Sequence, residues 1–344
     1  MGKLLVTGGM GFIGSNFIKL LHEKREQLTV LNLDVMSYGA NPNNLAGLDK
    51  CPTYRFVKGS TTDASTVRSL LPEVHVVVNF AAETHVDRSI ANPGIFFENN
   101  TMGTMALLDK VRRADARFVQ ISTDEVYGQA LNGKSFTEED RLRPSSPYAA
   151  SKAAADLIVE SFHETYGLHT TILRCTNNFG PNQFPEKFIP KAIISSVVGR
   201  KIPLYGNGMQ IRDWIYVTDF CQAILLATEK GESGATYNVS AGNELPNIEV
   251  AKRILRKLNK PDSVIEFVED RPRHDARYSL DSTRIRQRMG WKPSHTFDDA
   301  LDETVNWYVK NENWWRPLLS DRILSPTPWK EKWGKWEESG RMSS

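Results

Sequence analysis

The chain has 344 residues, of which 40% are hydrophobic and 24% charged, and its formal net charge is +2. These proportions are ordinary for a globular protein, and the length suits two domains better than one. Basic and acidic residues are interspersed without a basic block, so a nucleic-acid partner is not expected. No apolar run reaches the roughly 18 residues of a membrane span, so a membrane association is not expected either.

The first half of the chain alternates short apolar runs with helical patterns. Helices are predicted at residues 12–24, 101–113 and 147–165; Ser146 suits the N-cap of the last one and Pro147 its first position. Strands are predicted at residues 3–7, 28–34, 54–58, 74–80, 118–122 and 170–174. Apolar strands separated by helices are typical of a parallel sheet buried on both faces, so residues 1–175 are predicted to form a doubly wound α/β domain of Rossmann type.

The pattern changes after residue 175, where loops rich in Asn, Pro and Gly separate short strands and helices. We expect residues 176–344 to form a smaller mixed α/β domain that covers the open edge of the first, with the chain crossing back into the first domain. Seven of the eight tryptophans lie from Trp291 to Trp336, which favours a packed C-terminal cap.

The three cysteines are odd in number and lack the spacing of a metal site. They are Cys51, Cys175 and Cys221. We expect reduced thiols in a cytoplasmic protein, with no metal bound. The N-terminus also lacks a signal-peptide pattern.

A glycine-rich turn follows the first predicted strand. Gly8, Gly11 and Gly14 have the spacing G-x-x-G-x-x-G and open the helix that follows. Such a turn lets the backbone approach a pyrophosphate, which then meets the N–H groups of the helix N-terminus. Asp34 ends the second predicted strand 20 residues beyond Gly14, where a carboxylate accepts hydrogen bonds from ribose hydroxyls. It would repel the extra phosphate of NADP, so NAD is the expected cofactor.

Two groups of residues indicate the chemistry. Tyr148 and Lys152 are spaced i, i+4 and so share one face of the long predicted helix. A neighbouring ammonium and a positive nicotinamide ring are expected to lower the pKa of Tyr148 toward neutrality. Thr123, Asp124 and Glu125 stand at the end of the fifth strand, and the backbone has to turn near Asp124 if all three face one pocket. Mutual repulsion in a pair of carboxyls separates their proton affinities, so that one serves as acid and the other as base; the residues alone permit either order.

Several segments carry a family resemblance. Residues 7–14, 81–89 and 122–128, together with Tyr148-x-x-x-Lys152, resemble the extended short-chain dehydrogenase/reductase family of NAD-dependent epimerases and dehydratases. Within it, Thr123-Asp124-Glu125 resembles the dTDP-glucose 4,6-dehydratases, and the likeness continues through Asn177-Asn178-Phe179-Gly180-Pro181 to the closing Pro326-Thr327-Pro328-Trp329.

The resemblance implies a role for each site residue. Tyr148, with Lys152, would deprotonate the hexose O4 while hydride passes from C4 to a tightly bound NAD, and Thr123 would align O4. Glu125 would take the C5 proton and Asp124 would protonate the departing O6. The cofactor contacts would be Gly8, Gly11, Phe12, Ile13, Gly14, Asp34, Ser37, Ser60, Thr61, Ala81, Ala82, Glu83, His85, Asn99, Tyr148, Lys152 and Asn178. The nucleotide-sugar contacts would be Thr84, Thr123, Asn177, Lys187, Phe188, Pro203, Leu204, Tyr205, Arg212, Asn247, Arg271 and His274, with Arg212 and Arg271 on the pyrophosphate.

Three places depart from the family pattern: Val35 follows the ribose-binding Asp in place of Lys or Arg, Ser60-Thr61 replaces Asp-Ile or Asp-Val, and Arg273 replaces a glycine. The resemblance also implies a homodimer, for which Met102, Met105, Leu108, Ala150, Ala154, Leu157 and Ile158 are candidate contacts. The nucleotide base stays open between thymidine and uridine. A UDP-sugar dehydratase, a nucleotide-sugar 4-epimerase or decarboxylase, and a non-catalytic NAD-binding protein are the alternatives.

Overall fold

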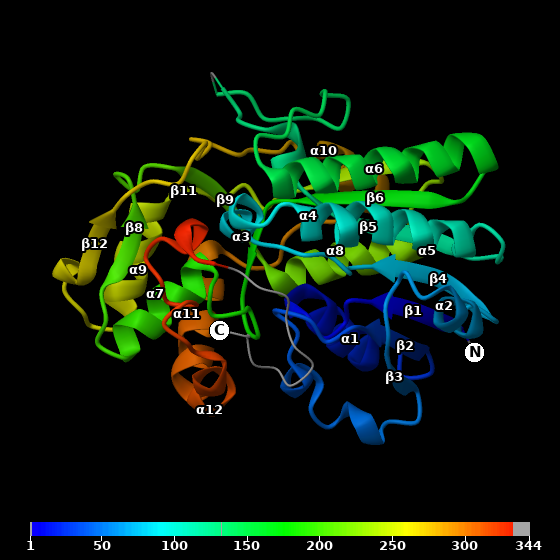
Figure 1. Ribbon diagram of the computed structural model, residues 1–344, viewed down its shortest axis with the longest axis horizontal. Helices are drawn as coiled ribbons and strands as arrows, with labels where there is room; N and C mark the ends of the chain where they lie inside the picture. Colours follow the sequence, from blue (N-terminus) through cyan, green and yellow to red (C-terminus); the bar gives the residue numbers. More distant parts are fainter. Residues whose placement is uncertain (1, 132, 333–344) are drawn as a thin grey trace.

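The computed structural model describes residues 2–131 and 133–332. Its centre is a seven-stranded parallel sheet in the order β10-β6-β5-β4-β1-β2-β3 (Figure 1). The strands are β1 (Lys3–Thr7), β2 (Thr29–Asp34), β3 (Tyr54–Lys58), β4 (Val74–Asn79), β5 (Arg117–Thr123), β6 (Thr170–Cys175) and β10 (Ala235–Val239). This sheet confirms the predicted Rossmann-type fold, and the strand order reverses between β1 and β4, where such sheets bind ligands.

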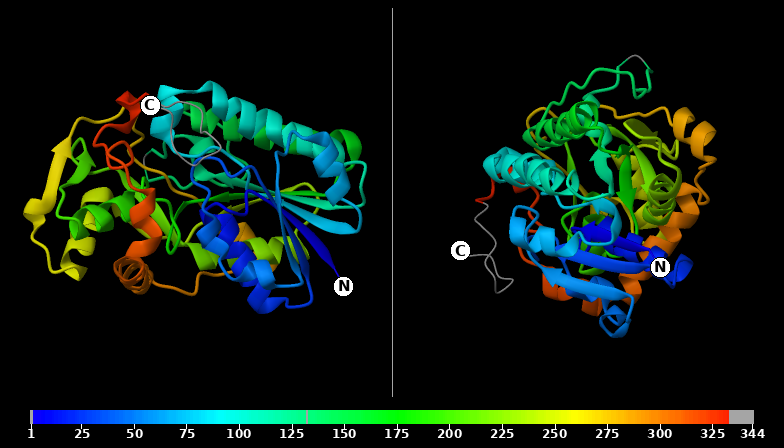
Figure 2. Two further views of the ribbon diagram at one scale, coloured as in Figure 1. Left: turned by 60° about the horizontal axis from the view of Figure 1, so that its bottom comes forward. Right: turned by 90° about the vertical axis from the view of Figure 1, so that its right-hand side faces the viewer.

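Helices cover both faces of the sheet (Figure 2). One face packs against α1 (Phe12–Lys24), α8 (Val217–Lys230) and α10 (Thr283–Met289), and the other against α2 (Ala64–Leu70), α5 (Gly103–Val111) and α6 (Pro147–Tyr166). Successive strand residues point to opposite faces, and both are covered, so Leu4, Leu5 and Val6 of β1 are all buried. This is why the strands read as unbroken apolar runs.

The helix boundaries follow the capping signals. Ser146 accepts a hydrogen bond from the Ala149 N–H at 3.1 Å and Pro147 begins α6, as predicted. The helix predicted at residues 101–113 is shorter: Phe97–Met102 forms a π-helical turn that leads into α5. No helix within the described stretches is both long and apolar enough to cross a membrane.

The second part of the molecule lies beyond the carboxyl edge of the large sheet (Figure 1). It contains a three-stranded sheet, β11-β9-β7, and a two-stranded sheet, β12-β8. Its core includes Tyr308 and Trp315, both fully buried. The remaining elements are β7 (Asn177–Phe179), α7 (Phe188–Val197), β8 (Ile202–Tyr205), β9 (Ile211–Tyr216), β11 (Glu244–Pro246), α9 (Asn247–Lys257), β12 (Ile265–Val268), α11 (Phe297–Lys310) and α12 (Glu312–Trp315), with the short α3 (Val86–Ala91) and α4 (Gly94–Phe96) after β4.

The chain returns to the large sheet after first leaving it. β10 pairs in parallel with β6, and α8 packs beside α1 in one hydrophobic cluster. A division at residue 175 stays a prediction, and it would separate β6 from its neighbour β10. Of the C-terminal tryptophans, Trp291, Trp315 and Trp329 are buried, while Trp333 and Trp336 lie outside the described residues.

Candidate active site

A cavity of about 440 Å³ opens at the carboxyl end of the large sheet, and both parts of the molecule line it. Every residue that we assigned to a site from the sequence lines this cavity, so the structure brings all of them together. They are Gly8, Gly11, Phe12, Ile13, Gly14, Asp34, Ser37, Ser60, Thr61, Ala81, Ala82, Glu83, Thr84, His85, Asn99, Thr123, Asp124, Glu125, Tyr148, Lys152, Asn177, Asn178, Lys187, Phe188, Pro203, Leu204, Tyr205, Arg212, Asn247, Arg271 and His274. Their individual roles stay predictions.

The part of the cavity lined by residues 8–14, 34–37 and 81–85, here called the cofactor side, is built mainly from backbone. Gly8 has a φ of +69°, and a Cβ there would lie 2.7 Å from the Ala81 N, so only glycine fits this crossing of β1 and β4. The N-cap of α1 is Gly11, which offers no side chain to the first N–H groups of the helix. These N–H groups and the helix dipole suit the phosphates of a dinucleotide.

Asp34 is held in place at the end of β2. One carboxylate oxygen accepts the Met10 N–H at 2.9 Å and the other accepts the Met36 N–H at 2.7 Å. Burial raises the pKa of Asp34, and the two backbone hydrogen bonds oppose that rise. Each carboxylate oxygen has a second lone pair, so the side chain keeps acceptor capacity toward ribose hydroxyls.

The segment after β4 forms the other wall of the cofactor side. Asn100 fixes it by accepting the Glu83 N–H at 2.7 Å and donating to the Glu83 carbonyl at 3.0 Å. The Glu83 carboxylate is itself paired with Arg88 at 2.9 Å. Glu83 therefore shapes this wall through its backbone, while its side chain is engaged by the protein. Asn100 was missed from the sequence because nothing in a lone Asn indicates that it braces a neighbouring loop.

The reacting groups meet where β5 ends. A 3₁₀ turn at Asp124–Tyr127 follows Thr123 directly, which supplies the predicted change of direction. The Thr123 hydroxyl donates to Asp124 Oδ1 at 3.1 Å and accepts the Glu125 N–H at 3.3 Å. Asp124 Oδ2 and Glu125 Oε2 are buried and have no hydrogen-bond partner within the described parts of the chain. Both carboxyls thus present an unengaged oxygen at the cavity.

The surroundings of Asp124 and Glu125 act differently on the pKa values of the two carboxyls. Burial raises the pKa of Asp124 well above its usual range, and the adjacent Glu125 adds to this rise. Burial also raises the pKa of Glu125, but Arg271, Arg212 and Lys187 oppose that rise. The protonated form is favoured more strongly at Asp124, which suits an acid, and the cations favour the ionised form of Glu125, which suits a base.

The environment that the protein alone provides for Tyr148 favours its neutral form. Burial raises the pKa of its phenol well above its usual range, nearby Glu125 adds to the rise, and a hydrogen bond with Thr123 opposes it. The Lys152 ammonium donates to the Ile121 carbonyl at 2.6 Å, and burial lowers the pKa of Lys152. The ammonium is therefore directed at the backbone of β5, and the groups of the protein alone keep Tyr148 in its neutral form.

The part of the cavity lined by residues 177–188, 203–212 and 247–278, here called the substrate side, carries several cations. Arg212 donates to the carbonyls of Ile211 and Asp275 at 2.7 and 3.0 Å and stacks on the ring of Tyr278. Arg271 donates from Nη1 to Asp87 at 3.0 Å. Arg271 Nε, like the side-chain oxygens of Asn177 and Asn247, is buried without a hydrogen-bond partner among residues 2–131 and 133–332. The Arg271 N–H suits an anionic group, and the two amide oxygens suit hydroxyl or N–H donors of a ligand.

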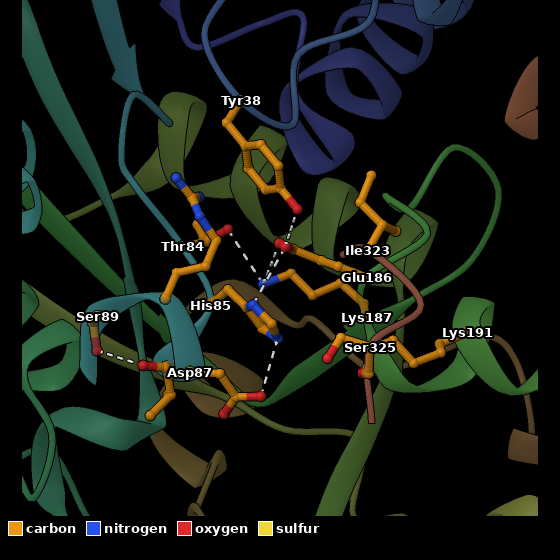
Figure 3. A network of polar contacts seen from close by, with 12 residues as sticks. Tyr38, Thr84, His85, Asp87, Ser89, Glu186, Lys187, Lys191, Ile323 and Ser325 are labelled. Carbon is orange, nitrogen blue, oxygen red and sulfur yellow. Dashed lines mark hydrogen bonds and ion pairs between the residues drawn. The ribbon is translucent and has the colours of Figure 1, made fainter. Parts of the chain in front are cut away.

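A network of charged side chains connects the two sides (Figure 3). His85 lies between Glu186, at 3.3 Å from Nδ1, and Asp87, at 3.6 Å from Nε2. Tyr38 donates a hydrogen bond to Glu186 across the cavity. We did not predict Tyr38, Asp87, Glu186 or Lys191 as site residues, although all four line the cavity. Asp87 stands in the quoted segment 81–89, so its position there was the available signal.

Comparison with known proteins places the chain in a family. The sequence pattern of the family described as GDP-mannose 4,6 dehydratase matches residues 5–304. The chain belongs to this family. A dTDP-glucose 4,6-dehydratase from Xanthomonas campestris pv. campestris (strain B100) is 45% identical over 340 residues, covering 93% of this chain and 96% of that protein.

Two further members of the family are similar over nearly their whole length. The low-salt glycan biosynthesis protein Agl12 of Haloferax volcanii is 46% identical over 310 residues, covering 90% of this chain and 99% of that protein. The crystal structure of DesIV, a dTDP-glucose 4,6-dehydratase from Streptomyces venezuelae with NAD bound, superposes with a TM-score of 0.90 at 43% identity. It covers 92% of this chain and 100% of that one.

Proposed function

We propose that the protein is an NAD-dependent dTDP-glucose 4,6-dehydratase, a carbon–oxygen lyase that converts dTDP-glucose to dTDP-4-keto-6-deoxyglucose. Two of the relatives described above, the Xanthomonas protein and DesIV, carry this activity in their names, and DesIV binds NAD. The observation that carries the proposal is the pair Asp124 and Glu125, with one unengaged oxygen each, in the same cavity as Tyr148 and the glycine turn. A protein that only binds NAD has no use for such a pair.

The cofactor side fits NAD. The N–H groups at the start of α1 would take the pyrophosphate, and Asp34 a ribose. When bound, NAD accepts hydride from the sugar C4 and returns it to C6, and its positive nicotinamide ring favours the phenolate of Tyr148. Because the cofactor ends each turnover in its starting form, we propose that it is tightly held. The contact of Tyr38 with Glu186 joins the two sides and supports retention.

The residues of the chain divide the proton transfers. Tyr148 takes the proton from the sugar O4, and the Thr123 hydroxyl, which bonds to the phenol, aligns that oxygen. Once C4 is a ketone, its neighbouring C5–H becomes acidic, and Glu125 removes that proton. Asp124, held in its protonated form by burial, donates a proton to O6, so that the C6–O6 bond breaks and water leaves. When hydride returns to C6, Glu125 would give its proton back to C5, and the proton that Tyr148 took from O4 would replace the one lost from Asp124, so that the net loss from the sugar is one water.

Substrate contacts are proposed from the cations and the unpartnered buried atoms of the substrate side. Arg271 Nε and the guanidinium of Arg212 would bind the pyrophosphate, and the oxygens of Asn177 and Asn247 would accept hydrogen bonds from sugar hydroxyls or the base. Thymidine as the base rests on the named relatives.

We also propose that the protein is a homodimer. Met102, at the end of the π-helical turn, Met105 on α5 and Leu157 on α6 are 50, 38 and 56% exposed. Large apolar side chains exposed on neighbouring elements are candidates for a protein interface. Leu108, which we had grouped with them, is fully buried and belongs to the core. Sedimentation of wild-type protein and of Leu157→Glu tests this proposal, and a wild-type monomer at micromolar concentration contradicts it. A cytoplasmic location is proposed from the three free cysteines.

The deciding experiment incubates purified protein with dTDP-glucose, without added NAD, and measures product mass. We expect a product lighter by one water, which supports both the dehydratase activity and retained cofactor. A product formed only after NAD is added indicates weaker cofactor binding near Val35 and Ser60. An isomer of unchanged mass contradicts the dehydratase and indicates an epimerase. Turnover of UDP-glucose but not of dTDP-glucose would show that the base of the substrate is uridine and not thymidine.

A further inference from the structure

Asp87 is a buried carboxylate to which the catalytic steps assign no task. It lies in the first turn of α3 and is 1% exposed. Its Oδ1 accepts from Arg271 Nη1 at 3.0 Å, and its Oδ2 accepts from the Tyr205 hydroxyl at 2.7 Å. His85 Nε2 lies 3.6 Å from Oδ2 (Figure 3). One carboxylate therefore connects α3, next to the cofactor, with the ends of β8 and β12 on the substrate side.

Arg271 is engaged on one edge and unengaged on the other. Nη1 is taken by Asp87, whereas Nε is buried and has no partner in the described parts of the chain. The side chain lines the cavity. A guanidinium is planar and rigid, so fixing one edge also fixes the direction of the other. The contact with Asp87 thus determines where the unengaged N–H points.

Tyr205, the second partner of Asp87, packs against two further rings. The ring of Tyr205 makes edge contacts with Trp329, at 4.9 Å between centroids, and with His274, at 5.9 Å. Tyr205 therefore cannot follow a movement of Asp87 freely, and the hydrogen bond between them holds the carboxylate toward β8. The Asp87 carboxylate is therefore held on both oxygens, by Tyr205 on one and Arg271 on the other.

We propose that Asp87 is a positioning residue for diphosphate binding: it holds Arg271 so that the free Nε edge faces the pyrophosphate of the nucleotide sugar. This inference rests on the proposed function. Without Asp87, a long Arg side chain would have to be ordered by the ligand itself, which costs affinity. The carboxylate also keeps the guanidinium from turning toward Glu125, the other carboxylate that acts on its charge.

A purely electrostatic role for Asp87 predicts the opposite result. If Asp87 only neutralised part of the charge of Arg271, its removal would leave a stronger cation and tighter diphosphate binding. If Asp87 positions Arg271, its removal weakens binding although the net charge becomes more favourable. The sign of the change in affinity therefore separates the two roles.

The test is calorimetric titration of the NAD-loaded protein with dTDP, thymidine and inorganic pyrophosphate. For Asp87→Asn we expect the Kd for dTDP and for pyrophosphate to rise about 10- to 100-fold, as for other hydrogen bonds between charged groups, with thymidine binding unchanged. Turnover should show a higher KM with a smaller change in kcat. Arg271→Ala should have a similar effect, and the double variant should add little to it.

Several outcomes would overturn the inference. Equal or tighter binding of dTDP and pyrophosphate by folded Asp87→Asn would do so, as would an equal loss of thymidine binding. If Asp87→Asn does not fold, as judged by circular dichroism and NAD content, Arg271→Lys replaces it: this variant keeps the charge but lacks Nε, and undiminished pyrophosphate binding would refute the assignment. If the wild-type protein binds pyrophosphate but not dTDP, thymidine is refuted as the base, and the role of Asp87 can still be tested with pyrophosphate. If the wild-type protein binds neither ligand, both the proposed substrate and the role of Asp87 are refuted.

Discussion

The cofactor side and the substrate side of the cavity are built in different ways. On the cofactor side, a continuous glycine turn supplies the surface, and both oxygens of Asp34 are held by the backbone of residues 10 and 36. On the substrate side, Asn177, Asn247 and Arg271 come from three separate loops, and each keeps a buried polar atom without a partner in the described residues. The cofactor side thus meets its ligand mainly with backbone, and the substrate side mainly with side-chain atoms that have no partner among the described residues.

This difference has an energetic consequence. Unsatisfied buried polar atoms cost free energy, which a ligand recovers when it bonds to them. Substrate binding should therefore stabilise the fold through the substrate side, while the cofactor side should resist any change in shape. The predictions below test this contrast.

The largest effect is expected at the carboxyl pair where the two sides meet. Asp124→Asn and Glu125→Gln should each slow product formation by about 10²- to 10⁴-fold, because each removes one proton transfer. Asp124→Asn should still oxidise C4, so the absorbance of reduced cofactor should accumulate on the enzyme in stopped-flow measurements. Loss of that absorbance together with loss of dTDP binding would show that Asp124 shapes the site and does not serve as its acid.

The next effect concerns His274 on the substrate side. Burial, Arg271 and Arg212 lower its pKa from 6.5 to about 4. As the pH falls from 6.5 to 4, His274 is therefore protonated in the unfolded chain but still neutral in the folded protein. In this window the free energy of unfolding should fall by up to about 1.4 kcal/mol per pH unit. Above pH 6.5 the contribution of His274 is constant.

Denaturant titrations at several pH values check this dependence. His274→Gln should flatten the pH dependence between 6.5 and 4 relative to wild type. Saturating dTDP should flatten it as well, because an anion favours the protonated imidazole. A wild-type slope that dTDP leaves unchanged would indicate that the diphosphate binds away from His274 and would weaken the contrast between the two sides.

A matched pair of glycines tests the rigidity of the cofactor side. A Cβ at Gly14 would lie 2.6 Å from the Gly8 carbonyl oxygen, whereas a Cβ at Gly94 meets nothing within 4 Å. Gly14→Ala should cost about 1–3 kcal/mol of stability and reduce the NAD content, because backbone would have to move. Gly94→Ala, also in a helix, should be neutral or stabilising. Equal thermal stability and equal NAD content in both variants would mean that the cofactor side yields more easily than its packing indicates.

The smallest effect is expected at Arg273. This exposed residue replaces a family glycine and has a φ of +53°, in the left-handed region that favours glycine. Arg273→Gly should stabilise the protein by about 0.5–1 kcal/mol, with dTDP affinity unchanged. Arg273→Ala is the control, since it removes the charge but keeps the strained backbone. A gain of similar size in the alanine variant would assign the effect to charge.

The sequence predicted the features that depend on neighbouring residues. The helix at 12–24 and the strand at 54–58 have the predicted bounds, because periodicity, capping and glycine spacing are local. The β10 strand pairs with a strand 64 residues earlier, and Asp87 contacts Tyr205 and Arg271 across 118 and 184 residues; local patterns do not reveal such contacts. Local patterns also do not reveal burial, which raises the pKa of Tyr148 in the protein alone; the lowering expected beside the nicotinamide ring stays a prediction.

The late strand β10 also constrains how the protein is made. On a ribosome, the first six strands of the large sheet emerge before α8 and β10, and β10 ends 64 residues after β6. Until that segment has been synthesised, the outer edge of β6 stays unpaired and the apolar face of α1 stays uncovered. Unpaired strand edges and exposed apolar surface promote aggregation. A chain cut after residue 175 is therefore expected to aggregate, because it would keep the glycine turn and Asp34 but lack the strand and helix that cover β6 and α1.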